Sequence, residues 1–311
     1  LFYRILYTKV FRMLYRFFCL FTIKEDKILF ASDSRTDMSG NFGFVYDEML
    51  SRNLDFDYHF MLKGNIKERK SFGEIVRLAY DLATSKFIML DDFYPMIYPL
   101  KIRKNAELVQ LWHAVGAFKT FGFSRIGLPG GPSPRSKNHR NYTKVIVSSH
   151  HIAKYYAEGF GIDEEKVIPT GIPRTDIFFD EQYQQKVKNE LYEQYPYLRD
   201  KKVIMFAPTF RGNGQQSAHF PMESLDLEKL YHALKDEYVF IYKIHPFVKN
   251  DINIPYEYSD FFYDFSDYRE INDLLFATDI LITDYSSVCF EFALLNRPML
   301  FFAYDVEKYV Q

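Results

Sequence analysis

The sequence is poor in cysteine and lacks the short motifs that identify most nucleotide-binding and hydrolytic sites. Cys19 and Cys289 are the only cysteines among 311 residues, and neither lies in a C-x-x-C spacing, which indicates free thiols in a reducing compartment. P-loop, H-E-x-x-H, G-x-S-x-G and complete G-x-G-x-x-G patterns do not occur in the sequence. The net charge of −2 provides no general attraction for polyanions, so we expect no nucleic-acid partner.

Acidic residues are missing from the first 24 positions, where basic residues alternate with aromatic and aliphatic ones. Lys9, Arg12 and Arg16 share one helical face, and Arg4 precedes them. No apolar run approaches the roughly 18–20 residues of a membrane-spanning helix, and no signal-peptide cleavage pattern follows. We predict that residues 1–24 form an amphipathic helix that contacts an anionic membrane surface through these four basic side chains. The alternative is that the helix packs on the protein's own core.

From residue 28 onward, short apolar runs alternate with amphipathic stretches, which is typical of parallel sheets covered by helices on both faces. The first series predicts strands at 28–32, 58–62, 87–90, 108–112 and 145–148, with helices at 41–52, 72–84 and 150–160. The second predicts strands at 203–207, 239–244, 261–263, 280–283 and 299–302, with helices at 226–236, 269–277 and 287–295. We therefore predict an α/β protein with two doubly wound, Rossmann-like domains, 25–180 and 181–311, that face a cleft after the N-terminal helix.

Two predicted strands, one in each domain, end in a histidine. His113 lies in the run LWHAVG and His245 in the run YKIHP. Ligands of open parallel sheets bind beyond the carboxyl ends of the strands, and a histidine there is suited to general-base chemistry. Lys243 points to the same side as His245, so the two could hold a diphosphate. A lone histidine is more often structural, but one at a strand end in each domain favours a functional role for both.

Other polar residues also follow predicted strands. Ser286 and Ser287 open a helix, where free backbone N–H groups form a general phosphate cradle, although a simple serine cap is the alternative. Pro208, Thr209 and Arg211 follow the first strand of the second domain, and their basic end could contact an anionic donor.

Between the domains, Arg174 could clamp a phosphate with its planar guanidinium. The loop residues Ser39, Gly40 and Asn41 could face an acceptor or cap the helix that follows. The acidic pair at 91–92 has no evident partner ligand, so we assign it a local structural role and expect no metal or other cofactor.

Several segments together resemble, in order, the CDP-glycerol glycerophosphotransferase family, the teichoic acid primases and polymerases of Gram-positive bacteria. They are QLWHAVGAFK at 110–119, VIVSS at 145–149, VIPTGIPRTD at 167–176, VIMFAPTFRG at 203–212, YKIHPF at 242–247 and ATDILITDYSSVCFEFALLNRPMLFF at 277–302. The resemblance implies a two-domain glycosyltransferase-B (GT-B) fold. It also implies transfer of glycerol phosphate or ribitol phosphate from a CDP-activated donor to the terminal hydroxyl of a lipid-linked, teichoic-acid-type acceptor, with release of CMP.

The resemblance also implies roles for individual residues. His113 would deprotonate the acceptor hydroxyl, and His245 would stabilise the donor diphosphate and the departing CMP. The residues implied to bind the CDP part are Arg174, Pro208, Thr209, Lys243, Ser286 and Ser287, with Ser266 and Glu270 nearer the cytidine. Ala114-Val115-Gly116 replaces the family's usual Gly-Thr-Pro after the histidine, which could alter the acceptor pocket.

The expected location is the cytoplasmic face of the cell membrane, because CDP donors are cytosolic and the acceptor is lipid-linked. We expect both native ends of the protein to lie outside this sequence, since it begins with Leu1 and lacks the family's usual C-terminal segment. Two alternatives stay open. One is a GT-B glycosyltransferase that uses a nucleotide sugar. The other is a non-enzymatic scaffold of a cell-wall assembly complex.

Overall fold

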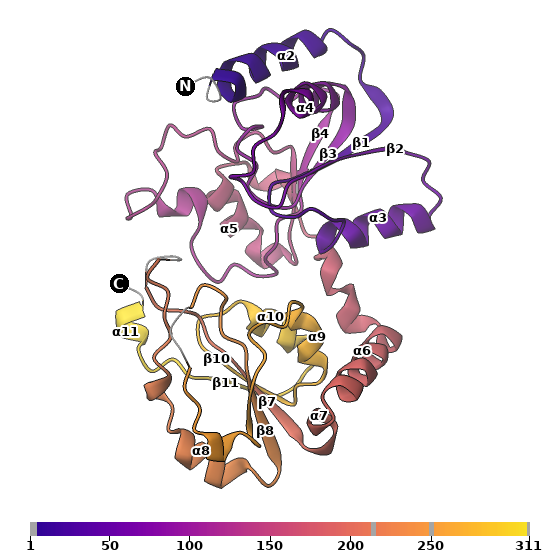
Figure 1. Cartoon of the computed structure of the whole chain (residues 1–311). Coiled ribbons are helices and arrows are strands. Elements are labelled where there is room, and N and C mark those ends of the chain that lie inside the picture. Colours follow the sequence, from indigo (N-terminus) through magenta and orange to yellow (C-terminus); the bar gives the residue numbers. More distant parts are fainter. Residues whose placement is uncertain (1–4, 213–215, 249–251, 310–311) are drawn as a thin grey trace. The chain divides into compact units, whose positions relative to one another are not determined.

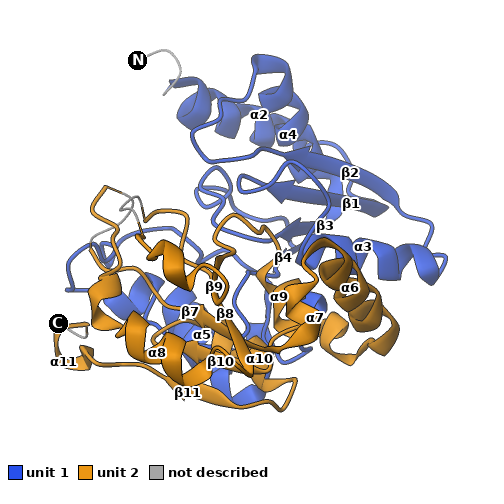
Figure 2. Cartoon of the chain, turned by 60° about the horizontal axis from the view of Figure 1, so that its bottom comes forward, with its two compact units in different colours: residues 1–174 blue, residues 175–311 orange. Residues whose placement is uncertain are grey.

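The computed structural model describes residues 5–212, 216–248 and 252–309. The chain divides into two compact units, Leu1–Arg174 and Thr175–Gln311, which Figure 2 colours separately. Each unit contains one parallel sheet, so the predicted α/β class with two parallel sheets is confirmed. The division lies slightly before the boundary predicted at residue 180, within the 3₁₀ segment Pro173–Phe179.

The sheet of unit 1 has six strands in the order β2-β1-β3-β4-β5-β6. All of its pairings are parallel. The strands are β1 Lys24–Ser32, β2 Asp57–Leu62, β3 Ser85–Leu90, β4 Glu107–Gln110, β5 Lys144–Ile146 and β6 Val167–Ile168. The sequence predicted the first five, whereas β6 is too short to give a periodic signal.

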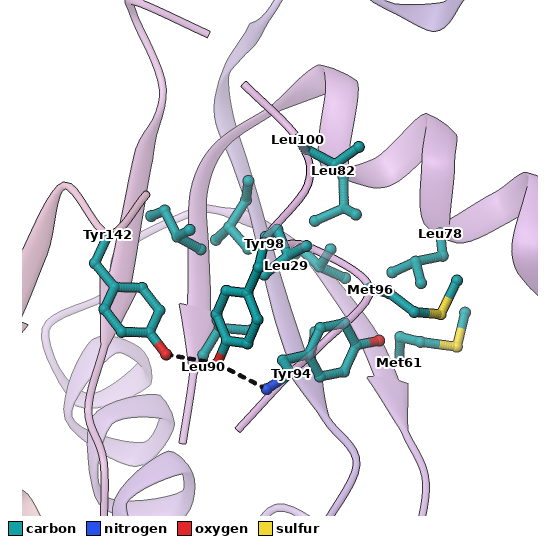
Figure 3. Close-up of a cluster of buried hydrophobic side chains, with 14 of the residues drawn as sticks. Leu29, Met61, Leu78, Leu82, Leu90, Tyr94, Met96, Tyr98, Leu100 and Tyr142 are labelled. Atoms are coloured by element: carbon teal, nitrogen blue, oxygen red, sulfur yellow. Dashed lines mark hydrogen bonds between the residues drawn. The ribbon is translucent and has the colours of Figure 1, made fainter. Parts of the chain in front are cut away.

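Helices cover both faces of this sheet. The longer ones are α3 Asn41–Ser51, α4 Phe72–Thr84 and α5 His150–Phe160. Along β1, Leu29 and Ala31 pack into the core that α4 and α5 share, while Ile28 and Phe30 pack against α3. This alternation explains why β1 reads as a continuous apolar run. Figure 3 shows part of the larger core, where the Tyr142 and Tyr98 hydroxyls lie 2.8 Å apart among leucine and methionine side chains.

The N-terminal segment is helical from Leu6 to Phe18, as the π-helix η1 Leu6–Val10 followed by α2 Phe11–Phe18. It lies against α4 (Figure 1), with Phe11 and Tyr15 buried. The Tyr15 hydroxyl donates to the Lys101 carbonyl at 2.9 Å. One face of this helix is therefore packed on the core of unit 1, as the alternative interpretation expected. The last residues of the range predicted to be helical, 1–24, belong instead to a turn and to β1.

The basic residues predicted to meet a membrane are exposed where the structure describes them. Lys9 lies on η1, Arg12 and Arg16 lie on α2, and Arg4 lies outside the described residues. None of the helices in the described ranges has the length and apolar character needed to cross a bilayer.

The sheet of unit 2 has five strands in the order β11-β10-β7-β8-β9, and all of its pairings are parallel. The strands are β7 Lys202–Ala207, β8 Tyr238–Tyr242, β9 Phe262–Asp264, β10 Ile280–Thr283 and β11 Met299–Phe301. The helices are α6 Glu181–Gln194, α7 Tyr197–Asp200, α8 Leu227–Leu234, α9 Ile271–Phe276, α10 Val288–Ala293 and α11 Val306–Tyr309. Each strand predicted in this half of the sequence is confirmed.

Both sheets contain a point where the strand order reverses. In unit 1 the chain continues from β1 to β2 on one side and from β3 onward on the other, and in unit 2 the same reversal separates β7 from β10. Loops that follow the two strands diverge at such a point, which leaves a crevice at the carboxyl edge of the sheet. The fold therefore directs attention to the residues just after β1, β3, β7 and β10.

A buried ion pair joins β1 to α4. The Lys27 ammonium is fully buried, donates to Asp81 at 2.7 Å and to Thr84 at 2.9 Å, and lies 4.5 Å from the ring centre of Tyr80. Removing one partner of an ion pair this deeply buried leaves the other charge uncompensated, which strongly destabilises the folded protein.

We expect Lys27→Ala to lower the free energy of unfolding of unit 1 by about 3–5 kcal/mol, because Asp81 would keep a buried charge without its nearest cation. The Lys27→Met/Asp81→Leu pair should cost less than the sum of the single variants. Urea unfolding followed by the fluorescence of Trp112, the only tryptophan, measures both. The matched control is Lys166→Ala, since Lys166 makes only a 3.8 Å surface pair with Asp163. Additive costs would contradict the prediction.

Candidate active site

His113 lies beyond the end of β4, with half of its side chain exposed. The indole of Trp112 stacks on the imidazole, with ring centres 4.4 Å apart and planes inclined by 27°. The Asp92 carboxylate is 3.5 Å from His113 Nδ1. The imidazole is thus accessible to a substrate, held against an aromatic face and approached by a carboxylate on one nitrogen.

The backbone around His113 is fixed by side chains from other elements. Trp112 has a left-handed φ of 58°, and its N–H donates to the buried Gln110 side chain at 2.9 Å. The Trp112 carbonyl accepts a hydrogen bond from Asn41, and the Val115 carbonyl accepts one from Ser148. The Tyr156 hydroxyl lies within hydrogen-bond distance of the carbonyls of Ala114 and Gly116. With these carbonyls engaged, the loop has little freedom to change shape, and the position of His113 is set before a substrate arrives.

Asn41 connects this loop to Arg174. Asn41 is the first residue of α3, and it is only 3% exposed. The amide nitrogen donates to the Trp112 carbonyl at 2.9 Å, and the amide oxygen accepts the Arg174 backbone N–H at 3.0 Å. Asn41 was predicted on the acceptor side together with Ser39 and Gly40. Because both ends of its buried amide are occupied, its contribution in this structure is to hold two loops together.

Arg35 and Asp91 bridge the point where the strand order of unit 1 reverses. Arg35 follows β1 and its Nε donates to the Asp91 carboxylate, which follows β3, while its Nη1 donates to Ser39 at 2.8 Å. Burial raises the pKa of Asp91, and the hydrogen bond of Ser32 and the charge of Arg35 oppose that rise. Gly40, with a φ of 59°, allows this arrangement, because an added Cβ would lie 2.9 Å from the guanidinium.

The acidic pair therefore has two separate roles. Asp91 binds Arg35, as the structural interpretation expected, but Asp92 faces His113, which the sequence analysis missed. A signal was present: β3 and β4 are adjacent, with Leu90 opposite Gln110, so residues that follow the two strands must be neighbours.

In unit 2, Asp284 joins the loops that follow β7 and β10. Its Oδ1 accepts the backbone N–H of Thr209 at 2.7 Å and the Thr209 hydroxyl at 2.9 Å, and its Oδ2 accepts Arg211 Nη1 at 3.0 Å. Arg211 also donates to Asp305 at 2.7 and 2.9 Å. Burial disfavours the charge of Arg211, but these carboxylates outweigh it and raise its pKa. Arg211, predicted as a donor ligand, thus has its charge matched within the protein and orders the loop that contains the buried Pro208 and the partly buried Thr209.

Lys243 and Ser266 are brought together at the ends of β8 and β9. Lys243 Nζ donates to the Ser266 carbonyl at 2.8 Å, and the Ser266 hydroxyl accepts the Ile244 N–H at 3.0 Å. Burial lowers the pKa of Lys243, and nearby carboxylates partly restore it, among them that of Glu270. Glu270 itself is exposed at the start of α9 and lies 3.7 Å from Arg269.

His245 is exposed between two phenylalanines. Its ring centre is 5.0 Å from that of Phe210 and 4.5 Å from that of Phe247. Nδ1 accepts the Phe247 N–H at 3.1 Å, so a neutral ring carries its proton on Nε2. This tautomer suits a hydrogen-bond donor to an anion rather than a base.

The serine pair precedes the short helix α10. Ser286 accepts a long hydrogen bond from the Val288 N–H at 3.4 Å, while the exposed Ser287 makes no side-chain cap bond. Neither serine is therefore a full helix cap, which weakens the alternative that the pair serves only to cap the helix. Within the described ranges, no three side chains of histidine, cysteine or acidic residues converge on a position suited to a metal ion.

The bridging role of Asn41 is testable by stability. Asn41→Leu removes both hydrogen bonds and should lower the free energy of unfolding of unit 1 by about 1–3 kcal/mol. Asn41→Asp keeps the acceptor for Arg174 but sets a carboxylate against the Trp112 carbonyl, so it should also destabilise and alter Trp112 fluorescence. Asn65→Leu, at an exposed loop position, is the control and should cost under about 0.5 kcal/mol. Wild-type stability of both Asn41 variants would show that the bridge is unimportant.

Comparison with known proteins agrees with the family resemblance. The family model described as CDP-Glycerol:Poly(glycerophosphate) glycerophosphotransferase matches residues 13–311. Teichoic acid poly(ribitol-phosphate) polymerase of Bacillus spizizenii is 68% identical over 310 residues, which is 100% of this chain and 50% of that protein. Teichoic acid ribitol-phosphate polymerase TarK of Staphylococcus aureus is 50% identical over 305 residues, 97% of this chain and 60% of that protein.

The fold is also similar to that of a solved relative, the wall teichoic acid polymerase TagF. The TM-score is 0.72 at 24% identity, over 98% of this chain and 78% of that one. The chain spans about half the length of the first of these curated relatives. Because the family model covers nearly the whole sequence and the identities to its members are high, the chain belongs to the CDP-glycerol:poly(glycerophosphate) glycerophosphotransferase family.

Proposed function

We propose that the protein transfers a polyol phosphate from a CDP-activated donor to the terminal hydroxyl of a lipid-linked, teichoic-acid-type acceptor and releases CMP. The observation that carries this proposal is the half-exposed His113, held by its stacked neighbour and by the anchored loop around it. Family membership supplies the reaction class. The nucleotide-sugar alternative has less support, since the curated relatives are named as polyol-phosphate enzymes.

In the proposed reaction, His113 takes the proton of the acceptor hydroxyl. The hydroxyl oxygen bonds to the β-phosphorus of the donor, and the bond from that phosphorus to the bridging oxygen breaks. CMP leaves with the electron pair of that bond. His245 and Lys243 would offset the charge that grows on the diphosphate, which is the main demand of phosphoryl transfer.

The donor would bind mainly to unit 2. Thr209, Ser286 and Ser287 follow the two strands at the reversal point of that sheet, where phosphate groups commonly bind. Ser266 and Glu270 follow β9 and would lie nearer the cytidine. Arg174 would add a positive charge to the phosphates. This scheme uses side chains and backbone N–H groups alone, so no metal enters the proposed reaction.

Ribitol phosphate is the group that we propose is transferred. Relatives named ribitol-phosphate polymerases are 68% and 50% identical to this chain. Relatives named for glycerol phosphate, among them a primase of Bacillus subtilis, are 30–37% identical to it. Donor selection depends on the pocket residues, and such residues are more often shared at the higher identity.

The proposal is tested by CMP release from CDP-ribitol, CDP-glycerol or a nucleotide sugar, each with a synthetic lipid-linked acceptor. We expect acceptor-dependent turnover of CDP-ribitol that persists in EDTA. His113→Ala should lower kcat by about 10²–10⁴-fold, as expected for loss of a general base. His245→Ala should lower it by about 10²–10³-fold through lost charge stabilisation. The control is His232→Ala, on α8 of unit 2. Turnover of the nucleotide sugar alone would overturn the proposal.

We further propose that the outer face of the N-terminal helical segment, η1 and α2, contacts the cytoplasmic membrane surface, where the lipid-linked acceptor resides. Its basic residues Lys9, Arg12 and Arg16 are exposed beside bulky apolar side chains. The exposed apolar residues on this segment are Ile5, Met13, Phe17, Leu20 and Phe21. Exposed cations beside exposed apolar side chains, with acidic residues missing, suit the interface of an anionic bilayer.

Vesicle co-sedimentation tests this contact. The wild-type protein should bind vesicles that contain phosphatidylglycerol and bind pure phosphatidylcholine weakly. The triple variant Lys9→Gln/Arg12→Gln/Arg16→Gln should bind anionic vesicles about 10²-fold more weakly, at about 1 kcal/mol for each lost charge. The control, Lys144→Gln/Lys166→Gln/Lys186→Gln, removes the same charge elsewhere and should bind like wild type. Equal losses in both triples would rule out a specific role for α2.

A further inference from the structure

We propose that Asp92 is the positioning residue of the base His113, which it orients so that Nε2 faces the acceptor hydroxyl. This inference rests on the proposed function, in which His113 removes the proton of that hydroxyl. The sequence alone predicts only a structural role for Asp92.

The geometry around the imidazole leaves few orientations. Trp112 covers one face of the ring, so rotation about the Cβ–Cγ bond is disfavoured except for the 180° flip that keeps the stack. In the orientation that the structure has, Asp92 Oδ1 lies 3.5 Å from Nδ1. This separation is long for a hydrogen bond, but contacts of catalytic groups often tighten only when the substrate binds. A small turn of either side chain closes it.

Asp92 is itself fixed relative to His113. Its Oδ1 accepts the Phe93 backbone N–H at 2.6 Å, which holds the carboxylate at the end of β3. The backbone carbonyl of Asp92 accepts a hydrogen bond from Gln110 Nε2 at 3.0 Å. Gln110 Oε1 in turn accepts the Trp112 backbone N–H at 2.9 Å. Gln110 is fully buried. A single glutamine amide therefore ties the backbone of Asp92 to the residue just before His113.

The neighbouring acidic residue does not compete for this role. Asp91 is 2% exposed and turns to Arg35, on the other side of the strand end. Asp92 keeps about a third of its side chain exposed, as expected for a group that borders a substrate site. Among the described residues, it is the carboxylate that lies within 4 Å of the His113 ring.

This placement determines which nitrogen acts. A carboxylate at Nδ1 favours the neutral tautomer with its proton on Nδ1, which leaves the Nε2 lone pair for the acceptor proton. After the transfer, the same carboxylate stabilises the imidazolium ion. Charge-assisted hydrogen bonds of this kind are stronger than neutral ones. The same division of labour orients the histidine in serine hydrolases.

The test combines kinetics with a substrate-free signal. We expect Asp92→Asn to lower kcat by about 10–10²-fold, a loss typical of a misplaced reacting group. The KM for the CDP donor should stay within about twofold, because donor binding is assigned to other residues. Asp92→Glu should recover part of kcat, since it keeps the charge. Asp163→Asn, an exposed carboxylate of the same unit, is the matched control and should behave like wild type.

The ring-nitrogen signals of His113 in a ¹⁵N-histidine-labelled protein give the second readout, with His113→Ala identifying them. The wild-type ring should be mainly the Nδ1–H tautomer, and Asp92→Asn should shift it toward Nε2–H. A wild-type urea midpoint, followed by Trp112 fluorescence, shows that the variant is folded, and Asp92→Ser provides a second variant if Asp92→Asn is unstable. Full activity of His113→Ala would overturn the proposed function. An inactive His113→Ala with wild-type kcat and tautomer in Asp92→Asn would overturn this inference alone.

Discussion

Both units depend on a buried aspartate that binds an arginine across the point where the strand order reverses. Asp91, after β3, binds Arg35, after β1, and Asp284, after β10, binds Arg211, after β7. Both carboxylates are almost fully buried, so breaking either pair would leave an uncompensated charge in the protein interior. Loops that would otherwise diverge at the carboxyl edge of each sheet are thereby held together. Ligands of such folds commonly bind at this point, and here an ion pair joins the two loops that border it.

Several of the candidate functional side chains lie directly beside these two pairs. Asp92 adjoins Asp91, and Ser286 lies two residues after Asp284. Thr209 is bonded to Asp284 itself through both its backbone and its hydroxyl. Groups that must act on a phosphate or a hydroxyl need to be held within a fraction of an ångström, and supporting residues usually provide that precision. Here the supporting residues carry charges that are already neutralised within the protein, so their bonds persist whether or not an anionic substrate is bound.

The sequence was sufficient to predict most strands and the positions of both histidines beyond strand ends, because continuous apolar runs and strand-end positions are local signals. The bonding partners of Arg211 could not be predicted in this way, since Asp284 and Asp305 lie far along the chain. From the sequence alone, a basic residue after a strand predicts a phosphate ligand, because its carboxylate partners are not visible there. The bridging role of Asn41 could not be predicted for the same reason, because its two partners come from distant loops. Long-range pairing, rather than residue type, decides whether a polar side chain serves the substrate or the fold.

Trp112 shows how the same contacts can stabilise a strained backbone and position the base. A bulky residue in the left-handed region is uncommon, and such a conformation costs about 1–3 kcal/mol. Its N–H and carbonyl are bonded to Gln110 and Asn41, and each bond contributes about 0.5–1.5 kcal/mol, enough together to offset the strain. The conformation places the indole against His113. The strained residue therefore lies directly beside the proposed base, and its stacked ring is part of the support of that base.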